Sequence, residues 1–174
     1  MAALTEKPAT PKLGWFGRRK VNKLLDEPEK LAAPRLARFG ASALPVLLEA
    51  IERGDSRSAK AAYLVGKLAE AGVDCRDALY PLFGLLQNGN DIEKGMSAVA
   101  LARMWTPESV SMLIAGMKDK NNITRLYSAL GLGMAPERNP LVENALRKAA
   151  GSDWDPKVRD QAQKSLRQIA ERLR

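Results

Sequence analysis

The chain has 174 residues, enough for one domain with a sizeable core, and its 28 Lys and Arg exceed its 20 Asp and Glu. It contains no histidine and a single cysteine, Cys75, which excludes an intrachain disulfide and nearly excludes zinc or iron sites with nitrogen and sulfur ligands. Histidine is also the commonest general base near neutral pH. The composition therefore gives no indication of catalysis, and we predict neither a metal nor a cofactor.

The residue usage favours helices and gives no sign of a membrane span. Aromatic residues make up only 5% of the chain while Ala and Leu are abundant, whereas sheet cores use more Val, Ile, Thr and aromatic residues. No apolar run approaches the roughly 18 residues needed to cross a bilayer. Residues 1–12 lack the apolar stretch of a secretory signal. A lone cysteine is typical of a reducing compartment, so we expect a cytoplasmic protein.

The first residues differ from the rest of the chain. Residues 1–14 contain Pro8 and Pro11 and show no apolar periodicity. Such a segment cannot bury enough apolar surface to order itself. The sequence therefore predicts a flexible N-terminal tail, followed by one domain at 15–174.

The next segment combines two aromatic residues with three cations, and its members are Trp15, Phe16, Arg18, Arg19 and Lys20. In one interpretation the two aromatic residues cover the open end of the first helical repeat, while the cations stay in water. In the other, the segment binds a phosphate backbone with base stacking, an anionic membrane surface or an acidic groove of a protein. Both interpretations are open at this point.

Short one-sided helices are predicted along the remaining chain, because apolar residues recur at positions i, i+3, i+4 and i+7. The predicted helices cover 17–25, 27–40, 43–53, 55–71, 76–87, 91–104, 107–118, 122–134, 140–150 and 155–173. Thr106-Pro107, Asn139-Pro140 and Asp155-Pro156 each place a capping oxygen before a proline in the first turn, where the missing N–H costs nothing. Gly54, Gly72 and Gly151 fall where helices should stop.

Two apolar patterns alternate along these helices, and each returns about every 32 residues. The first is anchored at Leu36, Val65, Leu101, Leu130 and Leu166, with spacings of 29, 36, 29 and 36 residues. The second passes through Leu47, Leu82, Leu113 and Ala145. Each helix is too short to be stable alone, so neighbouring repeats must bury its apolar face. The patterns predict an all-α fold, an α-solenoid (α-α superhelix) of about five helix pairs.

A family resemblance supports this architecture. The run Asp155-Pro156-Lys157-Val158-Arg159-Asp160-Gln161-Ala162 resembles the second helix of bacterial HEAT-like repeats, the type found in bilin lyases (PBS-lyase-type HEAT repeats). Residues 44–51 resemble the first helix of that family, and Trp15-Phe16-Gly17 resembles its opening segment. The resemblance covers about 15–174. It departs from the family in the middle repeats, where 55–59 and 90–94 carry no Asp-Pro-x-Val-Arg motif.

The resemblance implies that the second helix of each pair lines a concave face, where a partner would lie. Cations on the predicted second helices are Lys60, Lys67, Lys94, Arg103 and Arg125, and together they predict a positive ridge able to pair with carboxylates or phosphates. The alternative is that these cations are solvated or form local salt bridges. Arg159 matches a family position that stabilises the stacking of repeats.

Two tryptophans lie at predicted helix junctions, and charge is unevenly distributed along the chain. Trp105 and Trp154 stand at helix junctions, where aromatic residues usually plug the gap between repeats. Residues 1–60 carry 12 basic and 7 acidic side chains, residues 61–120 carry 6 and 7, and residues 121–174 carry 10 and 6. The positive excess therefore lies toward the two ends and favours an acidic partner.

From these observations we predict a non-catalytic scaffold or adaptor that binds a protein partner with an acidic surface along its concave face. The alternative is a HEAT-like protein that binds nucleic acid through its basic patches, as DNA-repair glycosylases of this architecture do. A bilin-lyase-like enzyme or enzyme subunit is less favoured. The identity of the partner and the oligomeric state stay open.

Overall fold

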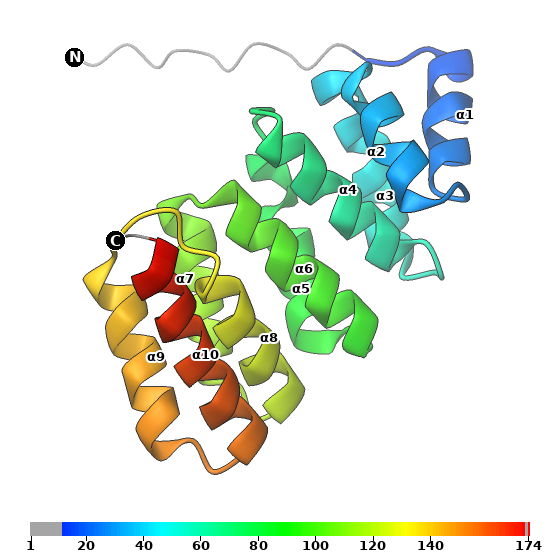
Figure 1. Ribbon diagram of the computed structural model, residues 1–174. Helices are drawn as coiled ribbons and strands as arrows, with labels where there is room; N and C mark the ends of the chain where they lie inside the picture. The colour runs from blue at the N-terminus through cyan, green and yellow to red at the C-terminus, as the bar shows by residue number, and fades with distance from the viewer. Residues whose placement is uncertain (1–11, 173) are drawn as a thin grey trace, which may run out of the picture.

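The computed structural model describes residues 12–172 and 174, and within them the chain is all-helical, with no strand (Figure 1). The α-helices are α1 (Trp15–Leu24), α2 (Glu29–Ala37), α3 (Leu44–Arg53), α4 (Ser58–Glu70), α5 (Leu79–Asn88), α6 (Asp91–Met104), α7 (Pro107–Gly116), α8 (Asn122–Leu132), α9 (Pro140–Ser152) and α10 (Pro156–Arg172). Short 3₁₀ turns at Gly40–Ala43 and Arg76–Ala78 precede α3 and α5. The all-α prediction is confirmed. Most of the predicted N-terminal tail, residues 1–11, lies outside the described residues.

The helix starts follow the capping chemistry expected from the sequence. The Asn90 side chain accepts from the backbone N–H groups of Ile92 and Glu93, both at 3.0 Å, and the Glu93 carboxylate accepts from the Asn90 N–H in return. Thr106 makes a similar reciprocal pair with Ser109 at the start of α7. These bonds satisfy N–H groups that a helix leaves unpaired in its first turn.

Several predicted helices are shorter in the structure than in the sequence analysis, and two of them have a clear local cause. The helix expected at 27–40 is α2, which ends at Ala37, and Pro34 inside it removes one helical hydrogen bond. The helix expected at 55–71 is α4, which begins only at Ser58. There the Asp55 side chain accepts from the Arg57 N–H at 2.8 Å and closes a turn instead of a helix.

The helices form two layers that lie side by side along an elongated stack (Figure 1). In one layer, which we call the second-helix layer, α4 packs on α6, α6 on α8 and α8 on α10. In the other, the first-helix layer, α3 packs on α5, α5 on α7 and α7 on α9. Each first helix also contacts the second helix that follows it, so every helix pair is joined to its neighbours on both layers.

The core lies between the two layers and consists mainly of leucine. Fully buried leucines from successive helices are Leu36, Leu47, Leu64, Leu68, Leu82, Leu86, Leu101, Leu113, Leu132 and Leu146. Removing a leucine side chain from water contributes about 1.5–3 kcal/mol. Among the described residues, no helix has both the length and the apolar composition needed to cross a bilayer.

Two glycines determine how closely the second helices approach. A Cβ atom on Gly66 of α4 would lie 3.0 Å from the Ala100 Cα of α6. A Cβ atom on Gly131 of α8 would lie 3.0 Å from the Ala98 carbonyl oxygen, also on α6. At these two points the helix backbones pack at distances that any larger residue would increase.

Candidate functional site

Four of the five cations predicted to form a positive ridge lie on adjacent helices, Lys60 and Lys67 on α4 and Lys94 and Arg103 on α6. Lys67 donates to the Glu70 carboxylate at 2.5 Å, and the Arg103 Nε lies 3.6 Å from the same carboxylate. The hydrogen bond from Lys67, together with the nearby charge of Arg103, holds the pKa of Glu70 below its ordinary value. The Arg103 guanidinium also lies 5.3 Å from the centre of the Tyr63 ring. Lys60, two turns before Lys67 on α4, is partly exposed.

Lys94 does not belong to an exposed ridge, which corrects the sequence prediction. Only 4% of the residue is exposed, and its Nζ donates to the carbonyl oxygens of Leu86 at 3.2 Å and Gln87 at 2.6 Å. These carbonyls belong to the last turn of α5, where helical partners are missing. Burial lowers the pKa of Lys94. Its side chain therefore caps the preceding helix and is not accessible to a partner.

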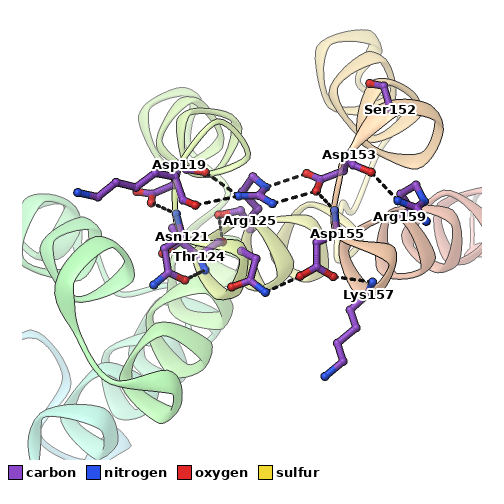
Figure 2. A network of polar contacts seen from close by, with 12 residues as sticks. Asp119, Asn121, Thr124, Arg125, Ser152, Asp153, Asp155, Lys157 and Arg159 are labelled. Atoms are coloured by element: carbon purple, nitrogen blue, oxygen red, sulfur yellow. Dashed lines mark hydrogen bonds and ion pairs between the residues drawn. The ribbon is translucent and has the colours of Figure 1, made fainter.

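Arg125 is also buried, and this corrects the prediction for a second member of the ridge. Its Nε and Nη2 donate to the two carboxylate oxygens of Asp153 at 2.8 and 2.9 Å, and only 5% and 7% of the two side chains are exposed. Its Nη1 donates to the carbonyl oxygens of Asp119 and Lys120 at 2.9 and 3.2 Å. Figure 2 shows the guanidinium between the α7–α8 turn and the α9–α10 turn, which it joins.

Lys94, Arg125 and Arg159 share one position and one role. Each is the fourth residue of a second helix, α6, α8 or α10, and follows the capping Asn or Asp by four residues. Arg159 donates to the Asp153 carbonyl at 2.7 Å, as the other two donate to carbonyls of their own preceding turns (Figure 2). The interpretation of Arg159 as a packing residue agrees with this contact, and the same interpretation now extends to Lys94 and Arg125.

The outer side of the second-helix layer is apolar where the ridge was expected. Ile92 and Val99 of α6 lie about two helical turns apart on one stripe, and Ile92 is 66% exposed. Ile123, Leu126 and Leu130 form the matching stripe of α8, and all three are partly exposed. We call these five residues the α6–α8 face. The two helices approach closely because Gly95 of α6 leaves room for the Tyr127 ring of α8. A Cβ atom on Gly95 would lie 3.0 Å from that ring.

The aromatic segment at the start of α1 stays largely in solvent. Trp15 and Phe16 are 64% and 74% exposed, and their rings meet edge to face with centres 4.8 Å apart. Neither ring is buried against the described helices, which corrects the interpretation that they cover the first repeat. Arg19 lies 5.5 Å from the Trp15 ring, and Lys20 is exposed. Arg18 instead binds Glu49 of α3 at 2.6 Å and joins the first two helix pairs.

A cleft with a volume of about 430 Å³ opens between the ends of α7 and α9. Its apolar lining consists of Ile114, Met117, Ala145 and Ala149, and its charged lining includes Lys118, Lys120 and Lys148. Arg125, Asp153 and Trp154 form the wall next to α10. Volumes of this order are typical of ligand pockets. Within the described residues, this cleft combines an apolar interior with exposed cations, and sequence reasoning did not predict it.

The position of Trp154 differs from the prediction, in which this residue plugs a gap between repeats. It is 71% exposed, and its ring lies over the buried Arg125 guanidinium with 4.5 Å between the ring centre and the Cζ atom. Such a cation–π contact fixes the ring in place without burying it. Trp105, by contrast, is half-buried and packs against the core, as predicted for a junction residue.

Two carboxylates support this region. Burial alone would raise the pKa of Asp153, but hydrogen bonds from Arg125 and from the Asp155 N–H outweigh it and hold that pKa below its ordinary value. The pKa of Asp155 is also lowered, first by a hydrogen bond from the Asn122 side chain and then by backbone N–H groups that include that of Lys157. Both carboxylates therefore stay charged and tie α8 to α10 (Figure 2).

Neither a metal site among the described residues nor a matching known protein indicates a function for these surfaces. Within residues 12–172, no group of three or more His, Cys, Asp or Glu side chains is arranged to hold a metal ion. No protein-family model matches the chain, and no curated protein matches its sequence.

Proposed function

We propose that this protein is a non-catalytic binding module, an α-solenoid of HEAT-like helix pairs that holds a partner protein on its α6–α8 face. The two interleaved apolar patterns of the sequence and the alternating packing of first and second helices support a solenoid. In such a stack each helix pair buries its apolar core face against its neighbours. The outward side of the second helices is therefore not needed for the core and is accessible to a partner.

The observation that carries the proposal is the apolar α6–α8 face. Ile123, Leu126 and Leu130 occupy positions i, i+3 and i+7 of α8, beside Ile92 and Val99 of α6. Isolated apolar residues on a surface are ordinary, but two adjacent apolar stripes on neighbouring helices together form an apolar surface suited to packing of a third helix. The function is therefore the docking of an amphipathic helix of a partner, whose apolar side chains would be buried at about 25 cal/mol per Å².

The charges beside this face favour an acidic partner helix. Lys60 is partly exposed on α4, and no ion pair within the described residues involves it. Arg103 shares the Glu70 carboxylate with Lys67, so these three side chains together keep one net positive charge. Rim charges of this kind affect the rate of association and the choice of partner more than the affinity.

Nucleic-acid binding, the alternative drawn from the basic ends, has less support. Many cations toward the N-terminal end are already paired, as in Arg18 with Glu49, Arg35 with Glu27 and Arg57 with Asp26. Arg125 and Arg159, toward the other end, are held by carbonyl and carboxylate groups of their own repeats. Strong binding to phosphates needs many unpaired Lys and Arg side chains, which displace the counterions condensed on the nucleic acid.

The test compares three versions of the protein as bait in a lysate of the native host. The first is the natural protein, the second carries Leu126→Asp and Leu130→Asp, and the third carries Leu141→Asp as a matched control. Leu141 is 69% exposed on α9, outside the α6–α8 face. We expect one or more proteins to be retained by the natural protein and the control but lost from the double variant. The affinity of that partner, once purified, should fall by about a hundredfold in the double variant.

Equal retention by all three versions would exclude the α6–α8 face as the docking surface. Failure of the natural protein to retain any specific partner would contradict the proposal as a whole. Circular dichroism of each variant separates loss of binding from loss of folding.

A further inference from the structure

Small side chains on α9 leave room for the cleft between α7 and α9. Ala145 and Ala149 line the cleft together with Ile114 of α7 and Met117, which follows that helix. The core anchor of α9 is Leu146, which is fully buried, as Leu47, Leu82 and Leu113 are in the earlier first helices. The cleft therefore lies beside the core of this helix pair and is bounded on the α9 side by two alanines.

The rim of the cleft carries cations without partners. Lys118 and Lys120 stand in the α7–α8 turn and Lys148 stands on α9, and all three are exposed. None of them forms an ion pair with any residue from 12 to 172. Asp119, between the first two, directs its carboxylate to the Asn121 N–H at 2.8 Å. The rim is therefore positively charged and open to an anionic ligand.

The wall beside the rim is a fixed aromatic surface. Arg125 is held by hydrogen bonds to Asp153 and to two carbonyls, and the Trp154 ring lies over it. The rest of the Trp154 side chain is in solvent, since the residue is 71% exposed. Tryptophans held in this way lose little freedom on binding, and they are the residues most often found at energetic centres of protein interfaces.

We propose that this cleft binds a short acidic segment of a partner protein. An apolar side chain of the segment enters beside Ala145 and Ala149 and packs on Trp154. Carboxylates that flank this side chain pair with Lys118, Lys120 and Lys148. The site lies in the first-helix layer and does not include any residue of the α6–α8 face, so it stands independently of the function proposed above.

The surroundings of the cleft favour a peptide over a nucleic-acid strand. A strand that leaves the cleft along α7 meets no cation, because Pro107–Gly116 contains neither Lys nor Arg. On α9, Arg147 is already paired with Glu143 at 2.5 Å. The three lysines of the rim all belong to this one cleft, which suits a local cluster of carboxylates and not a backbone with evenly spaced phosphates.

The experiment selects binders from a displayed library of random peptides, with the full-length natural protein as target. Enriched peptides are then synthesised with a fluorescent label, and their affinity is measured by polarisation at two salt concentrations. We expect the enriched sequences to combine Asp or Glu with one large apolar residue, and their binding to weaken as salt increases.

Two variants test the site and one serves as a control. Ala145→Leu with Ala149→Leu fills the cleft with two larger apolar side chains, and should weaken binding of the peptides about tenfold or more. Lys118→Glu, Lys120→Glu and Lys148→Glu together should do the same, and they change only exposed residues, so this variant remains informative if the filled protein does not fold. Lys30→Glu, on the exposed surface of α2, should leave affinity unchanged.

Several outcomes would overturn the proposal. They are a library that yields no acidic peptides, peptides that bind the filled and charge-reversed variants as well as the natural protein, and a single-stranded oligonucleotide that displaces the peptides and binds more tightly than they do. The Leu126→Asp and Leu130→Asp variant should bind the peptides normally, so failure of this site and failure of the α6–α8 face are distinguishable.

Discussion

Two groups of cations in the C-terminal half of the molecule have opposite roles. Arg125 and Arg159 are held by carbonyl and carboxylate groups of the turns that precede their helices. Lys118 and Lys148, at the neighbouring cleft, are exposed and form no ion pair among the described residues. The comparison teaches that the cation four residues after the cap of a second helix belongs to the fold, whereas the exposed lysines at the cleft are available to a partner.

The largest effect is expected from Arg125→Met, which removes the cation from the first group. The change leaves the Asp153 carboxylate buried without its partner and two carbonyls without a donor, so the free energy of unfolding should fall by about 3–5 kcal/mol. Denaturant unfolding followed by circular dichroism measures this loss. Lys118→Met is the matched control and should change stability by less than about 0.5 kcal/mol. Similar effects for the two substitutions would remove the distinction between the groups.

A smaller loss is expected from Lys94→Met, which tests whether the same rule holds in an earlier repeat. The carbonyls of Leu86 and Gln87 lose their donor, which costs about 1–3 kcal/mol, while the burial of a charge is relieved. The net fall in the free energy of unfolding should therefore be smaller than for Arg125→Met. Amide hydrogen exchange should show faster opening at the C-terminal end of α5. Unchanged exchange there would contradict the capping role.

The pH dependence of stability provides a third test. Because the pKa of Asp153 is lower in the folded state than in the unfolded chain, its stabilisation is present above the ordinary pKa of an aspartate and is lost as pH falls through the folded-state value. The midpoint of unfolding in the natural protein should therefore fall on acidification below about pH 4. Asp153→Asn should be less stable at neutral pH and should show a shallower acid dependence. An equally steep acid dependence in this variant would place the titrating group elsewhere.

The smallest effect, and one of opposite sign, is expected from Ala149→Leu. The larger side chain fills space in the cleft, which Ala149 lines. Stability should rise by about 0.5–1 kcal/mol or stay unchanged. Thermal unfolding measures the effect. A loss of more than about 1 kcal/mol would show that the cleft cannot accept a larger residue without strain.

Much of the fold was predictable because local signals determine it. The apolar spacing of 3.6 residues and the caps at Thr106, Asn139 and Asp155 place most helix boundaries within a few residues of those observed. The early start predicted for α4 missed the turn at Asp55, where a side chain competes with the helix for a backbone N–H. Helix propensity alone does not reveal that competition.

The candidate site was less predictable, although one signal was present. Lys94, Arg125 and Arg159 each follow a capping residue by four positions, and this shared spacing distinguishes them from Lys60 and Arg103. The predicted ridge grouped Lys94 and Arg125 with Lys60 and Arg103 because all four lie on second helices. It did not take into account the position of each cation within its helix. Trp154 could not be placed from sequence, because its position depends on a guanidinium that comes from the preceding helix pair.

The close approach at Gly66 and Gly131 bears on how this protein would distinguish among partners. Where backbone atoms limit the distance between helices, the spacing cannot be adjusted by changing side-chain rotamers. The contact of Gly131 with Ala98 sets the spacing of α6 and α8, so the α6–α8 face keeps this spacing before any partner arrives and little ordering remains to be done on association. Discrimination would depend on the size of the incoming residues, so a bulky substitution in the bound helix should be rejected instead of accommodated.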